Sequence, residues 1–286
     1  MLSFLNPKII YLFGVFTNIL TMNIVKYIGL NGVLTIPEVI CLRTTLATIL
    51  LFPFSVKEFK QVKTENKINK KTIIYLFILG VIAGVSSYAW NIGLQMVPIN
   101  NAIILLMFFS PTITAFIAHI ILSEKITRKI KISFAINLFA VSIIYKFSFD
   151  KFNFGYILIF TDFLIYAFVA ILIKKLQMFS SSFLVFIRLL ILLPISWLVI
   201  HKVPTINTSV ILFTLMVTFG YIIERTLITL TFKLIPISEV QPLRYFNLVF
   251  SAGLSFLILG EPLTIHQAIG MSIIVIGAII LRKMKK

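Results

Sequence analysis

The fold is decided by a short motif that occurs twice in the chain. Leu-Ser-Glu-Lys-Ile-Thr at residues 122–127 returns as Leu-Gly-Glu-Pro-Leu-Thr at residues 259–264, and each copy ends a long apolar stretch. Upstream, Leu-Gln-Met-Val-Pro-Ile at 94–99 resembles Phe-Lys-Leu-Ile-Pro-Ile at 232–237 with one residue of slippage. Because these matches keep the same order, they indicate an internal duplication.

The apolar stretches next to the motifs belong to a series that fills the chain. Of the 286 residues, 59% are hydrophobic and 12% are charged, whereas soluble domains contain about 25% charged residues. Since a membrane-spanning helix needs about 20 residues, this composition predicts a polytopic membrane protein and leaves no room for a soluble catalytic or nucleotide-binding domain. Apolar runs broken by charge, Pro or Asn predict spans at 9–28, 37–56, 72–94, 98–121, 130–147, 154–173, 181–200, 207–232, 237–259 and 265–282.

Basic residues lie mainly on one side of this predicted bundle. With a cytoplasmic N-terminus, 18 of the 26 Lys and Arg fall in cytoplasmic segments, 4 on the opposite side and 4 inside spans. The positive-inside rule therefore places both termini in the cytoplasm and supports an even number of spans. The net charge of +17 is explained by this orientation, and no nucleic-acid partner is expected.

The duplication and the number of spans together predict an inverted repeat. Five spans is an odd number, so the second copy enters the bilayer upside down. We expect an all-α integral membrane protein of ten transmembrane helices, with a first repeat at residues 1–148 (helices 1–5) and a second at 149–286 (helices 6–10). Inverted repeats are typical of transporters that alternate between inward-open and outward-open states.

These features resemble the EamA family of the drug/metabolite transporter superfamily. The likeness rests on the five-plus-five arrangement, the two motifs and Pro-Leu-Arg-Tyr at 242–245, and it covers essentially the whole chain. It implies a solute carrier of the cell (inner) membrane whose cavity is lined by the third, fourth, eighth and ninth helices. The Arg-Tyr pair is also similar to one in members that carry S-adenosylmethionine.

Polar side chains inside the predicted spans are the candidates for solute binding. A charge at mid-helix costs about 2.5–3.5 kcal/mol, so each requires a partner or a water-filled cavity. Adjacent residues are 100° apart on a helix, so Glu224 and Arg225 are expected on different faces, with Tyr221 able to flank either. The predicted substrate-binding residues are Trp90, Asn91, Tyr221, Glu224, Arg225, Arg244 and Tyr245.

The ninth predicted span also carries a polar stripe. Polar or charged residues recur along it at intervals of three and four, and such a stripe would be untenable against lipid. We expect it to face other helices; its polar members are Ser238, Gln241 and Arg244 or Tyr245, and Leu248 continues the same spacing.

Other residues in the spans have simpler structural explanations. Arg43 and Arg188 lie about two turns into their spans, where snorkelling or loop-anchoring ion pairs, for instance with Glu38, explain them. Asp162 in the sixth span could carry a proton or pair with Arg188.

Two further pairs are interpreted as structural. The glutamates of the two motifs, Glu124 and Glu261, sit at predicted helix ends and are expected to cap or brace the repeats. Gly80 and Gly84 in the third span are expected to allow close helix packing.

The predicted function is secondary transport of a small polar metabolite, such as an amino acid or a derivative like S-adenosylmethionine. Arg244 would hold its anionic group, Glu224 an ammonium or sulfonium, and Trp90 or Tyr245 any planar part. Alternatives are efflux of cationic drugs, in which Glu224 is essential and Arg244 structural, a lipid-type flippase or membrane enzyme, and an accessory subunit.

The remaining expectations concern chemistry and partners. The chain has no phosphate-binding loop of the ATPase type, its nine carboxylates form no catalytic cluster, and its three His have no metal-like spacing. We therefore expect no enzyme activity, no cofactor and no metal. The partners expected are the solute and the lipid bilayer; a proton, a counter-substrate and a second copy of the chain stay open.

Overall fold

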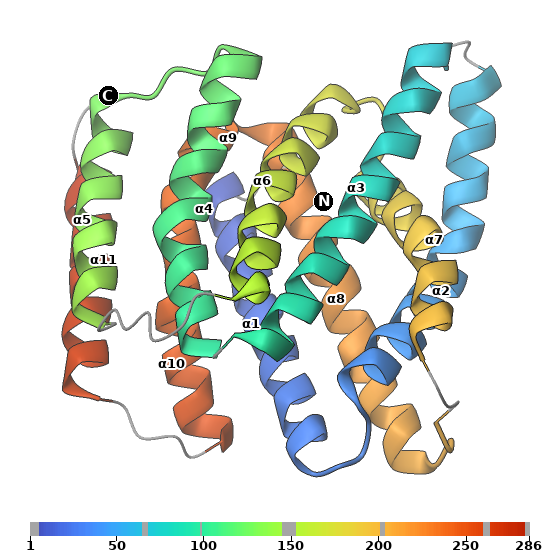
Figure 1. Cartoon of the computed structure of the whole chain (residues 1–286). Coiled ribbons are helices and arrows are strands. Elements are labelled where there is room, and N and C mark those ends of the chain that lie inside the picture. Colours follow the sequence, from blue (N-terminus) through green and yellow to red (C-terminus); the bar gives the residue numbers. More distant parts are fainter. Residues whose placement is uncertain are drawn as a thin grey trace. The chain divides into compact units, whose positions relative to one another are not determined.

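The structure is a computed structural model, and it describes residues 6–64, 68–97, 99–144, 153–200, 204–259 and 264–283. All regular elements in these ranges are helices (Figure 1). In chain order they are α1 (Pro7–Leu30), α2 (Ile36–Thr64), α3 (Lys70–Met96), α4 (Ile99–Leu122), α5 (Arg128–Ile144), α6 (Phe154–Lys175), α7 (Ser181–Val199), α8 (Thr208–Leu234), α9 (Ile237–Val240), the 3₁₀ helix η2 (Gln241–Tyr245), α10 (Phe246–Leu259) and α11 (Ile265–Lys283).

Helices occupy all ten predicted spans. In the described residues, seven of them are long and apolar enough to cross a membrane, namely α1 to α4 and α6 to α8, and α11 contains a shorter apolar stretch. The all-helical prediction is confirmed for these residues. The total of ten crossings and the cytoplasmic location of both termini stay predictions.

The ninth predicted span is interrupted. After the four residues of α9 the backbone tightens into η2 and becomes α-helical again only at Phe246. Pro242 is the second residue of η2, and its ring removes a backbone donor and disfavours a continuous α-helix there. The interruption places Gln241, Arg244 and Tyr245 on a short 3₁₀ segment between two helices.

The helices group into two compact units. Unit 1 consists of Met1–Gly84 and Leu172–Lys233, and unit 2 of Val85–Ile171 and Leu234–Lys286. Each unit therefore takes helices from both halves of the sequence. The three boundaries between the units' segments fall in α3, in α6 and at the last residue of α8. The predicted division into repeats at 148 is a different division, and its boundary lies outside the described residues.

Two helix pairs form the frame of unit 1. In the first pair α2 packs against α7, with the ring of Phe59 stacked on that of Phe183 at 6.2 Å. In the second pair α1 approaches α8 at Gly14, where an added Cβ would lie 3.2 Å from Ile228 Cγ1 and 3.3 Å from Leu227 Cβ. A buried cluster that includes Ala47, Leu51, Val185, Phe186, Leu189 and Tyr221 joins α2, α7 and α8.

Unit 2 is built on the pairing of α5 with α11 and on the contacts of α4 with α9 and η2. Gly270 and Gly277 let α11 approach α5 closely, because an added Cβ at either would crowd Ile144 or Ile136. The core around these elements includes Met107, Ala115, Phe134, Val141, Tyr245, Leu248 and Ile274. The interrupted segment is thus held from one side by a well-packed core.

Candidate functional site

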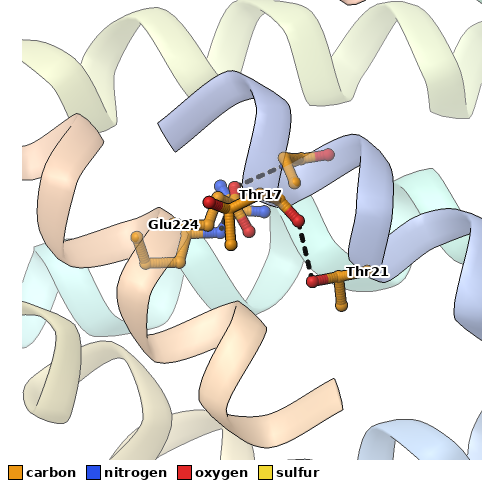
Figure 2. A network of polar contacts seen from close by, with 5 residues as sticks. Thr17, Thr21 and Glu224 are labelled. Carbon is orange, nitrogen blue, oxygen red and sulfur yellow. Dashed lines mark hydrogen bonds and ion pairs between the residues drawn. The ribbon is translucent and has the colours of Figure 1, made fainter. Parts of the chain in front are cut away.

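In unit 1 a buried carboxylate joins α8 to α1. Glu224 is only 3% exposed, and its Oε1 accepts a hydrogen bond from Asn18 Nδ2 at 2.5 Å. Arg225 Nε lies 3.3 Å from the same oxygen. Figure 2 shows this network beside Thr17 and Thr21 of α1, whose hydroxyls donate to backbone carbonyls one turn earlier, each at 2.8 Å. The carboxylate is therefore stabilised by an amide and a guanidinium before any solute is considered.

Glu224 and Arg225, expected on different faces of α8, are nevertheless in contact through their side chains. Their Cα–Cβ bonds diverge by 100°, but an arginine side chain is long enough to bring its guanidinium back over the preceding residue. Tyr221 flanks Arg225 as expected, with the guanidinium carbon 5.3 Å from the ring centroid.

Arg43 also reaches Tyr221. Its guanidinium carbon lies 4.1 Å from the ring centroid. The interpretation of Arg43 as a snorkelling group or a partner of Glu38 was therefore wrong. Glu38 instead accepts hydrogen bonds from the backbone N–H of Thr35 at 2.7 Å and from the Thr35 hydroxyl at 2.8 Å. The first of these is one of the two bonds of a capping box, in which the third helical residue accepts the N–H of the residue that precedes the helix.

In unit 2 the interrupted segment holds Arg244. The residue is 9% exposed, one of its terminal nitrogens donates to Ser110 Oγ at 2.5 Å, and its guanidinium carbon lies 4.1 Å from the ring centroid of Tyr166. Ser110 comes from α4 and Tyr166 from α6, so three elements orient this guanidinium. Tyr245 is fully buried in the core of the unit.

The polar stripe is buried, as predicted. Ser238, Gln241 and Tyr245 have no exposed surface, and the elements that carry them contact α4. Among the described residues, the hydroxyl of Ser238 and both polar atoms of the Gln241 amide have no hydrogen-bond partner. Because buried polar groups in proteins are nearly always hydrogen-bonded, these atoms are suited to meet water or a polar solute.

The other candidates in unit 2 lie in different surroundings. Trp90 is half-buried and packs on a cluster that includes Tyr156, Ile159 and Phe163. Asn91 belongs to α3, but its side chain lies outside the described residues. Asp162 accepts a hydrogen bond from the hydroxyl of Ser86; its proposed pairing with Arg188 stays untested, since the two belong to different units.

Glu124 performs the capping role expected of it. Its two oxygens accept the backbone N–H groups of Ile237 at 2.9 Å and of Ser238 at 2.8 Å, so the loop after α4 holds the start of α9. Its counterpart in the second motif, Glu261, lies outside the described residues.

Sequence reasoning missed one residue that carried a visible signal. Asn18 is an amide in the middle of an apolar span. Among the described residues, no group of three His, Cys, Asp or Glu side chains could hold a metal ion. The site chemistry described is that of guanidinium, carboxylate, amide and hydroxyl groups.

Comparisons with known proteins agree with this architecture. The model of the EamA-like transporter family matches residues 8–146 and 153–283. A solved structure named only "Crystal structure of protein" has a TM-score of 0.74 over 98% of both chains at 13% identity, which is a likeness of fold alone. No curated protein matches the sequence.

Proposed function

The chain belongs to the EamA-like transporter family, and from that membership we propose that this membrane transporter of the drug/metabolite transporter superfamily is a secondary carrier of a small polar metabolite. The solute is an amino acid or a derivative that bears both charges, of the kind that S-adenosylmethionine represents. It crosses the cell membrane by alternating access, and its transport can be coupled to a proton or a counter-substrate.

The observation that carries the proposal is the set of buried polar groups on η2 and α9. Gln241 and Ser238 bury polar atoms that no described residue satisfies, and Arg244, three residues after Gln241, is oriented by Ser110 and Tyr166. An apolar membrane protein retains such groups where a polar ligand or water meets them. An amide that both donates and accepts, next to a forked cationic donor, suits the carboxylate and amino groups of an amino acid.

Unit 1 contains the predicted substrate-binding residues Tyr221, Glu224 and Arg225. The two described contacts of the Glu224 carboxylate, with Asn18 and Arg225, both end on Oε1. In the proposal Oε2 receives the ammonium or sulfonium of the solute. Efflux of purely cationic drugs is a weaker explanation, because it assigns no ligand to the buried and oriented guanidinium of Arg244.

Replacement of Arg244 by Gln tests this function. The purified protein would be reconstituted in liposomes and offered amino acids, nucleosides, S-adenosylmethionine and organic cations. We expect saturable uptake of at least one zwitterionic solute by the wild type and a fall of about tenfold or more in kcat/KM for Arg244→Gln, since a hydrogen bond to a charged group contributes about 1.5–3 kcal/mol.

The control is Arg128→Gln, which removes the same group from an exposed position at the start of α5. It should leave uptake unchanged, and Arg244→Lys should lie between the two. Saturable uptake of every zwitterionic and anionic solute that is unaffected by Arg244→Gln would contradict the proposed role of this residue.

A further inference from the structure

Unit 1 carries exposed lysines at the end that is predicted to face the cytoplasm, and the proposed function does not use them. The helix α2 has 29 residues, so at 1.5 Å per residue it is about 44 Å long. The hydrocarbon core of a bilayer is about 30 Å thick. All lysines of α2 stand in its final residues, 57–64. Because a lysine inside the hydrocarbon is expensive, the excess length belongs at this end, in the layer of the lipid headgroups.

One face of this extension of α2 is fixed against the start of α7. The carboxylate of Glu58 accepts hydrogen bonds from the backbone N–H and the hydroxyl of Ser180. The next residue, Phe59, stacks on Phe183 with the ring centroids 6.2 Å apart. The extension is therefore a held part of unit 1, and its only described carboxylate is already engaged with Ser180.

The other face of the extension carries lysines. Lys57 and Lys60 are both exposed, and residues three apart on a helix share a face. The start of α3, which follows the end of α2 after five residues, adds the exposed Lys70 and Lys71. Among the described residues, none of these four lysines forms an ion pair.

Two contacts bring the end of α6 to the same place. Lys175 is exposed, and its Nζ lies 5.6 Å from the ring centroid of Tyr75, which stands one turn after Lys71 on α3. Lys175 also precedes by five residues Ser180, which Glu58 holds against α2. Three helices of unit 1 thus form a basic rim, which consists of Lys57, Lys60, Lys70, Lys71 and Lys175.

We propose that the basic rim binds the phosphate groups of anionic phospholipids in the adjoining leaflet. About four to eight basic residues directly beside a membrane-spanning helix attract anionic lipid, and each lysine ammonium offers three hydrogen-bond donors to phosphate oxygens. The contacts of Glu58 and Phe59 fix the helix that carries two of the lysines, so less freedom is lost when a headgroup binds. The bound lipid would anchor unit 1 at this surface of the membrane.

The test measures which lipids stay bound to the full chain. The protein is reconstituted in nanodiscs of equal parts phosphatidylglycerol and phosphatidylcholine, released into detergent, and its retained lipids are counted by mass spectrometry. Since several lysines act together, we expect the wild type to retain phosphatidylglycerol over phosphatidylcholine by about tenfold or more. With Lys57→Gln, Lys60→Gln and Lys71→Gln combined, the preference should fall to about threefold or less.

A matched variant separates the rim from the net charge of the protein. Lys125→Gln, Arg128→Gln and Lys131→Gln combined remove the same three charges from exposed positions of unit 2, and this variant should keep the wild-type preference. Arginine at the three rim positions keeps the charge and should also keep it. The ratio stays interpretable if a variant is less stable, because both lipids are counted on the same preparation.

Soluble phosphates are the competing source of the same chemistry. Inorganic phosphate and glycerol phosphate, added at the concentration of the lipid, should not displace the retained phosphatidylglycerol; displacement would assign the rim to a soluble phosphate and contradict the proposal. The proposal is also wrong if the wild type shows no preference, if the rim variant keeps it, or if both triple variants lose it equally. None of these results depends on which solute is transported.

Discussion

At the scale of single residues, the best-defined polar contact of unit 2 is the cap that Glu124 provides. Its carboxylate receives two backbone N–H groups at the start of α9, from Ile237 and Ser238. The first N–H groups of a helix have no partner within the helix, and α9 has only four residues with which to establish itself. The position of the segment that leads into Arg244 therefore depends on one side chain in the loop after α4.

Replacement of Glu124 by Gln should weaken this cap. The amide keeps one acceptor and turns a donor toward the second N–H, so we expect a loss of about 1–3 kcal/mol and a lower midpoint of thermal unfolding in detergent. Lys125→Gln, at the exposed neighbouring residue, is the control and should leave the midpoint unchanged. An equal midpoint for the two variants would show that the cap contributes nothing.

Single residues also show how far sequence reasoning reaches at this scale. Periodicity and apolar context predict that the stripe containing Ser238 and Gln241 is buried, and it is. Periodicity and apolar context do not predict which side chains contact each other. Arg43 contacts Tyr221 of α8, and Glu224 contacts Asn18 of α1. Such pairs depend on which helices become neighbours, which one sequence without its fold does not contain.

At the scale of elements, close packing of α3 depends on its glycines in different degrees. A Cβ at Gly80 would overlap Ile191 Cδ1 and lie 3.2 Å from the carbonyl oxygen of Ile187, on the backbone of α7. At Gly84, one turn further on, the nearest atom is Ile195 Cδ1 at 3.8 Å, an ordinary contact. Only the first of the two glycines is required for the approach of α3 to α7.

We therefore expect Gly80→Ala to destabilise the protein and Gly84→Ala to be neutral. Overpacking of a tight contact costs about 1–3 kcal/mol, which should appear as a lower thermal midpoint and lower yield of monodisperse protein for Gly80→Ala alone. The pair is matched, since both changes add one methyl group to the same helix. A larger effect at Gly84 than at Gly80 would refute the packing described for α3.

Most helices were predictable from the sequence, and the interruption at η2 was the exception. Long apolar runs predict α1 to α8 to within a few residues at most ends, although α2 continues to Thr64, eight residues beyond its predicted end at 56. The interruption at η2 was not predicted, although Pro242 signalled it. A proline in a transmembrane helix can be accommodated by a kink or by a 3₁₀ turn, and the surrounding helices decide between them.

At the scale of the whole molecule, the orientation in the membrane can be tested through the single cysteine. Cys41 is 1% exposed and should react poorly with labels; Cys41→Ser gives a background without thiols. In that background we expect Asn31→Cys, in the loop after α1, to react with an impermeant maleimide on spheroplasts. Lys60→Cys, near the end of α2, should react only after permeabilisation. The opposite pattern would reverse the predicted topology.

The two compact units differ from the two halves of the sequence. Unit 1 needs α1 and α2 from one half and α7 and α8 from the other. The matches of the family model, at residues 8–146 and 153–283, instead follow the chain. Sequence comparison detects the order of helices along the chain, whereas compactness reports which helices pack, so the two divisions need not coincide.

The contact between Asn18 and Glu224 has a consequence for biosynthesis. The two residues are 206 positions apart, and a ribosome adds about 5–20 residues per second, so α1 enters the bilayer about 10–40 seconds before α8 is complete. Throughout that interval the Asn18 amide needs another hydrogen-bond partner, which can be water, a lipid headgroup or the insertion machinery. The first helix to be made is thus among the last to reach its final surroundings, and a nascent chain that stalls before residue 224 exposes this amide to the quality control of the membrane.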